Sequence, residues 1–157
     1  MENGFVNKLA FDLMDYHGLS GWDFEINRGK YRLGLCSYVK KTIFVSGDII
    51  PINDKKAITE VLLHEIAHAL VGRGNGHNRT WKNKAIEIGS TGSRIIPDWV
   101  NTPPMRYLAT CPNGHTTEYE NMPKGNRSCG RCSNYYDVRY LFTFKPNPKL
   151  AKKGWYN

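Results

Sequence analysis

The chain has 157 residues, of which 40% are hydrophobic and 23% charged, a composition typical of one compact globular domain with room for a small appendage. Lysine and arginine outnumber aspartate and glutamate by 22 to 14, and the net charge of +8 indicates an anionic partner such as nucleic acid. The N-terminal residues lack the pattern of a signal peptide, and no apolar run approaches the roughly 20 residues of a membrane span. We therefore expect an intracellular, cytoplasmic protein with no membrane partner.

The first third of the chain is expected to form a helix followed by antiparallel strands. Apolar residues recur at helical spacing over 5–16, and Gly18 follows as an end signal. A turn is expected at 27–30, and Cys36 is expected as a small core residue. Alternating apolar residues predict three short strands, over 22–26, 31–38 and 42–45.

A second predicted helix, residues 54–71, carries the sequence His64-Glu65-Ile66-Ala67-His68, and Asn53 or Asp54 can cap its start. Two histidines four positions apart lie on one face of a helix, so both imidazoles can bind one metal ion. The glutamate between them can act as the general base for a water molecule at that metal, which is the H-E-x-x-H pattern of zinc peptidases. Such a glutamate on an otherwise apolar helix would be costly to bury without a function.

A catalytic zinc ion usually has three protein ligands, so a third must come from elsewhere in the chain. His77 is the favoured candidate, because it follows a glycine-rich loop that permits a sharp reversal after the helix. Glu87, on a third predicted helix over 79–88, is the alternative ligand, and His77 would then be only a polar residue capping that helix. The metzincin extension requires glycine and histidine where this chain has Val71 and Gly74, so that subclass is excluded.

A stretch rich in serine, threonine, glycine and proline over 90–104 is the best candidate for a domain boundary. The predicted organisation is a catalytic domain over 1–104, a zinc ribbon over 105–145 and a basic tail over 146–157.

Two further ligand pairs lie in the second part. Cys111 and His115 have the spacing C-x₃-H, and Cys129 and Cys132, thirteen residues further on, have the spacing C-x₂-C. In an intracellular protein, such cysteines are expected as thiols or metal ligands rather than disulfides. Four ligands with no open position indicate structural zinc in a small ribbon. A redox-active C-x-x-C pair and a site without metal are the alternatives.

Two stretches resemble the SprT-like zinc metalloproteases, which are related to the Spartan proteases that degrade proteins crosslinked to DNA. They are HEIAHALVGRGNGHNRTWKNKAIEIG, followed by the cysteine ribbon, and RLGLCSYVKKTIFVS. The resemblance covers roughly residues 5–145 and implies a minimal zincin-type α+β domain with His77 as third zinc ligand, followed by a ribbon. Trp81 matches a tryptophan at the same short spacing after that ligand. The resemblance also implies DNA-associated protein substrates and DNA-stimulated cleavage, in the cytoplasm, on nucleoid DNA or in a phage-infected host.

Basic residues interleaved with aromatic ones favour binding of single-stranded DNA, with cations on phosphates and rings on bases. The basic clusters are Arg28, Lys30 and Arg32, Lys40 and Lys41, Lys124, Arg127 and Arg131, and the run 145–153. The interleaved aromatic residues are Tyr31, Tyr38, Tyr135, Tyr136, Trp155 and Tyr156.

The sequence therefore predicts a zinc-dependent metalloendopeptidase that binds DNA and cleaves DNA-associated or DNA-crosslinked proteins, as in DNA repair. It would use Glu65 as base, one catalytic zinc ion and one structural zinc ion. The alternatives are a zinc-dependent nucleic-acid-binding module without protease activity and a general intracellular zinc peptidase. The intact Glu65 favours a protease, since a pure binding module does not need it.

Overall fold

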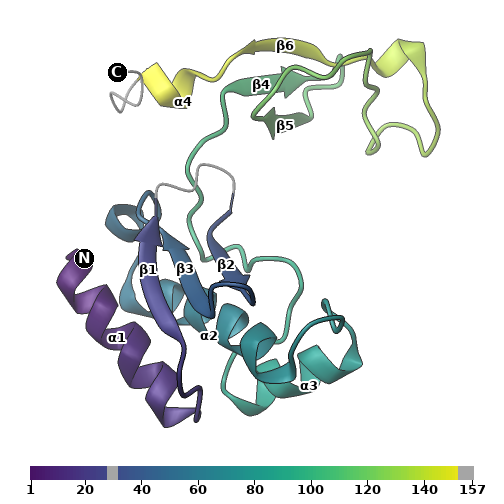
Figure 1. The fold of residues 1–157 in the computed structure, drawn as a ribbon. Coiled ribbons are helices and arrows are strands. Elements are labelled where there is room, and N and C mark those ends of the chain that lie inside the picture. Colours follow the sequence, from purple (N-terminus) through teal and green to yellow (C-terminus); the bar gives the residue numbers. More distant parts are fainter. Residues whose placement is uncertain (28–31, 152–157) are drawn as a thin grey trace. The chain divides into compact units, whose positions relative to one another are not determined.

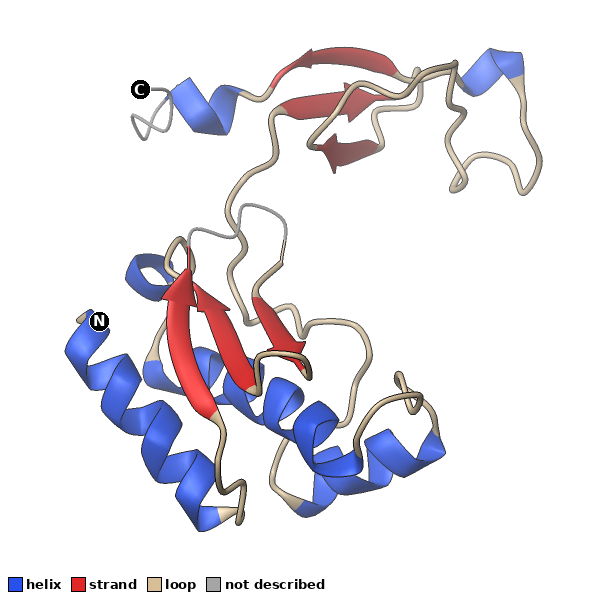
Figure 2. Ribbon diagram, viewed as in Figure 1, coloured by secondary structure: helices blue, strands red, loops and turns tan. Residues whose placement is uncertain are grey.

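The computed structural model describes residues 1–27 and 32–151. The chain divides into two compact units, Met1–Pro103 and Pro104–Asn157, and each is considered by itself. The described residues form four α-helices and two small three-stranded sheets, a mixed α+β fold (Figure 2). The turn expected at 27–30 and the first residue of the strand expected at 31–38 fall largely outside the described residues.

The helices of the first unit begin and end close to where the sequence predicts. The Asp54 side chain caps the second helix by accepting a hydrogen bond from the Ala57 N–H at 2.8 Å. Gly72, with a φ of 77°, ends the same helix in a conformation that favours glycine. The three helices are α1 (Asn3–Tyr16), α2 (Lys55–Val71) and α3 (Arg79–Glu87), and a short 3₁₀-helix, η1 (Ile50–Ile52), precedes α2.

The sheet of the first unit is mixed, which corrects the prediction of an antiparallel sheet. Its strands, β1 (Asp23–Asn27), β2 (Gly34–Ser37) and β3 (Thr42–Ser46), lie in the order β1-β3-β2. The hairpin of β2 and β3 is antiparallel as expected, but β1 pairs with β3 in parallel. The reason lies in β3, whose residues are all buried and whose consecutive apolar side chains suit a central strand covered on both faces. The strand β2 therefore takes the edge instead of pairing with β1.

The core of the first unit lies between this sheet and its helices (Figure 1). The helix α1 packs against β1 and α2, while α2 packs against β2, β3 and α3. The helix α2 is buried along most of its length, so side chains that project from it have fixed surroundings. The largest fully buried side chains of this unit are Trp81, Met14, Ile43, Ile49, Ile50, Ile58, Leu62, Ile66, Val6 and Val45.

The second unit is built on an antiparallel sheet with the order β5-β4-β6. Its strands are β4 (Tyr107–Thr110), β5 (Thr116–Tyr119) and β6 (Thr143–Pro146), and the 3₁₀-helix η2 (Val138–Tyr140) precedes β6. Three aromatic side chains, Tyr119, Phe142 and Phe144, meet edge to face with centroid separations of 5.2–6.5 Å. This unit has a small apolar core, so metal ligands would be a natural means of stabilising it.

The described part of the expected basic tail, residues 146–151, belongs to the second unit. It completes β6 and forms the one-turn helix α4 (Pro148–Ala151). The buried Asn147 side chain donates to the Met105 carbonyl at 2.9 Å, which ties this segment to the start of the unit. None of the described helices is both long enough and apolar enough to cross a lipid bilayer.

Candidate metal centre

The first cluster of possible ligands is built on α2. His64 and His68 are one helical turn apart and half-buried, with ring centroids separated by 5.2 Å. Their neighbours Leu63, Ile66 and Ala67 are buried in the core, which fixes the rotation of the helix about its axis. Both imidazoles therefore leave the helix on the same side.

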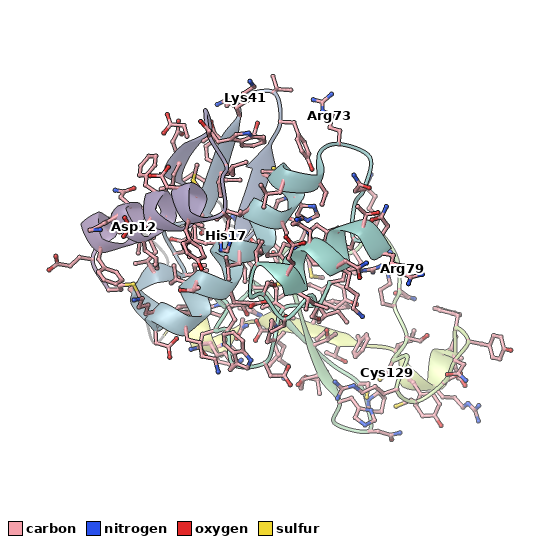
Figure 3. The ribbon with its side chains drawn as sticks, turned by 90° about the horizontal axis from the view of Figure 1, so that it is seen from below. Asp12, His17, Lys41, Arg73, Arg79 and Cys129 are labelled. Carbon is pink, nitrogen blue, oxygen red and sulfur yellow. The ribbon has the colours of Figure 1, made fainter. Side chains whose placement is uncertain are left out.

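His77 comes to these two residues through the loop that follows α2. Three glycines in this loop have φ values between 50° and 86°, which allows the chain to reverse direction within a few residues. The Asn75 side chain donates to the Val71 carbonyl at 2.7 Å and holds the loop against the helix end. Arg73, at the start of the loop, extends away from the ribbon in Figure 3.

The nitrogen atoms of the three histidines converge on one point. Nε2 of His77 lies 3.0 Å from Nε2 of His64 and 3.2 Å from Nε2 of His68. A tetrahedral zinc ion with bonds of about 2.05 Å separates its nitrogen ligands by about 3.3 Å. The three residues are one of two groups of ligand atoms among the described residues that could hold a metal ion. Their geometry and donor set fit a metal ion with three imidazole ligands.

The surroundings keep these imidazoles neutral, as ligands must be. Burial, followed by the neighbouring histidines, lowers the pKa of His64 to about 4, and burial with His77 does the same for His68. The pKa of His77 is lowered by burial and by the positive charge of Arg94. Near neutral pH all three rings can offer a lone pair.

Trp81 supports the whole group from α3. Its side chain is only 1% exposed, and its ring centroid lies 4.6–5.1 Å from those of His64, His68 and His77. Asn78 caps α3 by accepting from the Trp81 N–H at 3.1 Å, so the capping role considered for His77 belongs to Asn78. Among the described residues, the indole Nε1 is the one buried side-chain nitrogen or oxygen without a hydrogen-bond partner. The indole therefore supports the three imidazoles by ring packing and not by a hydrogen bond.

Glu65 turns away from its neighbours on α2 toward the edge strand β2. Its carboxylate accepts a hydrogen bond from the backbone N–H of Cys36. Burial raises the pKa of Glu65 to about 7, although this hydrogen bond and the charge of Arg32 both favour the ionised form. A carboxyl group with such a pKa, next in the sequence to a candidate metal ligand, suits the role of a general base.

Glu60, one turn before His64 on α2, has a structural role that the sequence did not predict. The residue is 8% exposed, and its carboxylate accepts hydrogen bonds from the Ser90 hydroxyl at 2.9 Å and from the Thr91 hydroxyl at 2.7 Å. The Thr91 N–H also donates to it at 3.1 Å. Glu60 thus holds the chain after α3 against α2. A glutamate within an apolar helix was the available signal, but its partners 30 residues away were not predictable.

Glu87, the alternative third ligand, does not join the cluster. Its carboxylate lies 2.6 Å from the Lys84 ammonium group in an exposed ion pair on α3. Cys36 is half-buried against the core, as the sequence predicts, and burial together with Glu65 raises the pKa of its thiol to about 12. Neither residue has the geometry of a ligand in the three-histidine group.

The second cluster lies in the second unit, where the four predicted residues come together (Cys129 is labelled in Figure 3). The Cys111 and Cys132 sulfur atoms are 3.8 Å apart, and His115 Nδ1 lies 3.2 Å from Cys132 Sγ and 3.6 Å from Cys129 Sγ. Bonds of about 2.3 Å to sulfur and 2.05 Å to nitrogen in a tetrahedral site would give separations of about 3.5–3.8 Å. The four atoms fit a metal ion with no open position.

The pKa values of two cysteine ligands are shifted in opposite directions. Burial opposes ionisation of Cys129, but hydrogen bonds from the backbone of Arg131 and Cys132 lower its pKa to about 7. Burial, followed by the hydrogen bond with the Cys129 thiol, raises the pKa of Cys132 to about 11. The Asn113 amide also donates to the Cys132 sulfur at 3.4 Å. Hydrogen bonds to a ligand sulfur are among the outer contacts that metal sites use.

The fold and the first cluster define a metallopeptidase-like domain. The SprT-like family model matches residues 6–101, more than half of the chain, and the chain belongs to the SprT-like family. That family is associated with zinc metallopeptidase-like function. The matched residues fall within the first unit and include all of the three-histidine group, whereas the cluster of Cys111, His115, Cys129 and Cys132 lies outside them. None of the curated proteins compared with the sequence matches it.

Proposed function

We propose that the protein is a zinc-dependent endopeptidase that cleaves proteins associated with or crosslinked to DNA, with its active site on α2. The observation that carries this proposal is the convergence of the His64, His68 and His77 Nε2 atoms, two of which project from the helix that also carries the buried Glu65. Three imidazoles form the ligand set of a catalytic zinc ion with an open position.

The chemistry divides between the ion and the chain. Zinc in this site would supply a Lewis acid that polarises a peptide carbonyl and lowers the pKa of water. His64, His68 and His77 would hold it, and Trp81 keeps their rings in place. Glu65 would take up a proton at its carboxylate and deliver it to the leaving amine. The N–H of Cys36 holds that carboxylate by a hydrogen bond, which limits the number of orientations it can adopt.

The second cluster would bind a structural zinc ion through Cys111, His115, Cys129 and Cys132. Its four ligand atoms lie within 4.8 Å of one another and leave no side for a substrate. A bound ion would fold the turns at 111–115 and 129–132 onto the small sheet of the second unit, which would then be a zinc ribbon.

Charge supports DNA as a partner of the second unit. Its sequence contains nine basic and three acidic residues, so this third of the chain carries +6 of the net +8. Each acidic side chain is already paired, with ion-pair distances of 2.7–2.9 Å for Asp137–Arg139, Glu118–Lys149 and Glu120–Arg106. Of the basic residues that the structure describes in this unit, the four without an acidic partner are Lys124, Arg127, Arg131 and Lys145. These charges are available for phosphates.

Aromatic surface in the same unit supports a single strand as the form of the DNA. Tyr135 and Tyr136 are 85% and 61% exposed and can stack on bases. A hollow of about 300 Å³ beside the cysteine cluster is lined by Tyr119, Phe142 and Arg131 among others, which offers rings and a cation together. Tyr38, by contrast, is half-buried and its hydroxyl binds α2, while Arg28, Lys30, Tyr31, Trp155 and Tyr156 lie outside the described residues.

A cleavage assay tests the proposal. The zinc-loaded protein is incubated with a DNA-binding protein, with and without single-stranded DNA, and again after a chelator has removed the metal. We expect cleavage that requires zinc, increases with DNA and returns when zinc is restored. Zinc-dependent cleavage that is indifferent to DNA would support a general zinc peptidase instead. Binding of DNA without cleavage under any of these conditions would support a binding module.

A further inference from the structure

One face of the edge strand β2 contacts α2. Alternate residues of a strand point to the same face, and here Gly34, Cys36 and Tyr38, which directly follows β2, all contact that helix. Gly34 and Cys36 contact Glu65, and the Tyr38 hydroxyl lies 2.9 Å from the His68 carbonyl and 3.2 Å from the Gly72 carbonyl. The strand therefore contacts the helix at the proposed base and at the helix end.

The Glu65 side chain closely approaches β2 at Gly34. A Cβ atom added to Gly34 would lie 2.7 Å from Cγ and 2.7 Å from Oε1 of Glu65, and 3.0 Å from its Cδ. These separations are well below van der Waals contact, and the three nearest atoms all belong to the Glu65 side chain. An isolated glycine within a strand marks such a close approach.

The backbone itself does not require glycine here. Gly34 is not among the residues with positive φ, and it pairs with Val45 in a regular antiparallel ladder. Alanine can adopt this conformation. The absence of a side chain at position 34 therefore serves the Glu65 carboxyl group, not the course of the chain.

The Glu65 carboxyl occupies the space above Gly34 because the next residue on the same face holds it there. The Cys36 N–H donates to the carboxylate, and β2 has no other strand along this edge in the described sheet. The glutamate side chain has three rotatable bonds, so it would swing to another rotamer if either the space or the hydrogen bond were lost. The two features together select one carboxyl position.

We infer that Gly34 is a positioning residue for the general base, because its missing side chain provides the space in which the Cys36 N–H holds the Glu65 carboxylate. This inference rests on the proposed function for the role of Glu65, and on the geometry alone for the contact.

The test begins with Gly34→Ala. Since the three nearest atoms belong to one flexible side chain, this variant should fold and keep both zinc ions while that side chain, with its carboxyl group, moves. Misplacement of a reacting group by about 1 Å can cost about 100-fold in rate. We expect kcat for protein cleavage to fall by about 100-fold with KM within about threefold of the parent, because the base acts in the transition state.

Rescue separates positioning from a general structural effect. Glu65→Ala removes Cγ, Cδ and Oε1, the three atoms that a Cβ at position 34 would meet first. In the Glu65→Ala background, Gly34→Ala should therefore lower the residual kcat by less than about threefold, a strong departure from additivity. Gly4→Ala is the matched control, because an added Cβ there meets nothing within 4 Å. Equal losses in both backgrounds would overturn the inference.

A second readout does not depend on cleavage. The amide proton of Cys36 reports its hydrogen bond to Glu65 in an NMR spectrum of the zinc-loaded protein. In Gly34→Ala it should shift upfield to the position that it takes in Glu65→Ala. A Cys36 resonance that does not move in Gly34→Ala would contradict the inference, whether or not the parent protein cleaves a substrate. If the resonance moves upfield in Gly34→Ala but the parent protein cleaves no substrate, the contact is supported and only the proposed function is refuted.

Discussion

His77 makes a three-nitrogen centre out of a helical pair of histidines. The pair at 64 and 68 follows from helix geometry alone, but the third ligand requires a specific loop conformation. The three positive-φ glycines and the Asn75 side chain supply that conformation. Whether His77 or Glu87 is the third metal ligand, which the sequence left open, therefore depends on single side chains.

Two alanine variants test which of the two residues is the third metal ligand. His77→Ala removes a ligand atom that lies 3.0 Å and 3.2 Å from its neighbours, so the protein should bind one zinc ion fewer per chain and lose cleavage. Glu87→Ala removes only an exposed ion pair and should keep the parent zinc content. Zinc per chain, measured by atomic emission, gives the answer. Loss of zinc from Glu87→Ala, with His77→Ala unchanged, would reverse the assignment.

Some residues at this scale were predictable and others were not. Asp54, Gly72 and His77 follow from local rules on caps, glycine and ligand spacing. The partners of Glu60 and the neighbours of Gly34 depend on contacts between segments about 30 residues apart, which no periodicity encodes. The signals were a charged residue in an apolar helix and a glycine in a strand, and both mark a special contact without naming its partner.

At the scale of elements, α2 is central because it carries two ligands and the proposed base while lying in the core. Its position is fixed on two sides. The Tyr38 hydroxyl binds carbonyls at its C-terminal end, and the Glu60 carboxylate binds the segment that follows α3. Asn53, just before the helix, also exchanges hydrogen bonds of 2.7–2.8 Å with Asn101 at the end of that segment.

The contribution of the Glu60 contact can be measured through the free energy of unfolding. Glu60→Ala leaves the Ser90 hydroxyl and the Thr91 N–H without their buried acceptor, which should lower the free energy of unfolding by about 1–3 kcal/mol. Glu87→Ala, which loses an exposed pair on the neighbouring helix, should cost less than about 0.5 kcal/mol. Urea titration followed by circular dichroism compares the two. Equal effects would mean that Glu60 has no special part in holding the segment.

The sheet shows where prediction by element fails. The three strands were found because their apolar residues alternate or run together. Their pairing was wrong for β1, since a sequence pattern gives the faces of a strand but not its neighbours. The buried run in β3 was the evidence that this strand lies in the centre, and a central β3 makes β1 and β2 its two partners.

At the scale of the whole molecule, the chain joins two units that differ in charge and in their clusters of possible metal ligands. The first contains the SprT-like match and is nearly balanced in charge, with 13 basic and 11 acidic residues. The second has a small apolar core, a four-ligand cluster and +6 of the net charge of +8. The division predicts that each unit can be impaired separately.

Metal ligands should decide the stability of the second unit only. Cys129→Ser removes a buried ligand, so the protein should bind one zinc ion fewer and the amide resonances of β4, β5 and β6 should collapse toward random-coil positions. Resonances of α2 should stay in place. A variant that retains the full zinc content and a dispersed spectrum would show that this cluster is not a structural metal site.

Charge should decide DNA binding. Replacing Lys124, Arg127 and Arg131 by alanine removes three of the unpaired cations of the second unit. Affinity for single-stranded DNA should fall, and the slope of log K against log salt should become shallower by about 0.7 for each lost phosphate contact. The control replaces Lys8, Lys55 and Lys84 of the first unit, which removes the same charge. Fluorescence anisotropy over a salt series measures both, and equal losses would assign binding to net charge alone.

The central claim is that a zinc ion on three histidines works with Glu65 as base. Its most direct test is the cleavage rate of Glu65→Gln at equal zinc content. Glutamine keeps the shape of the side chain but cannot accept the proton, so we predict the parent amount of bound zinc and a fall in kcat of at least about 100-fold. Cleavage by Glu65→Gln at the parent rate, with zinc bound, would contradict the account.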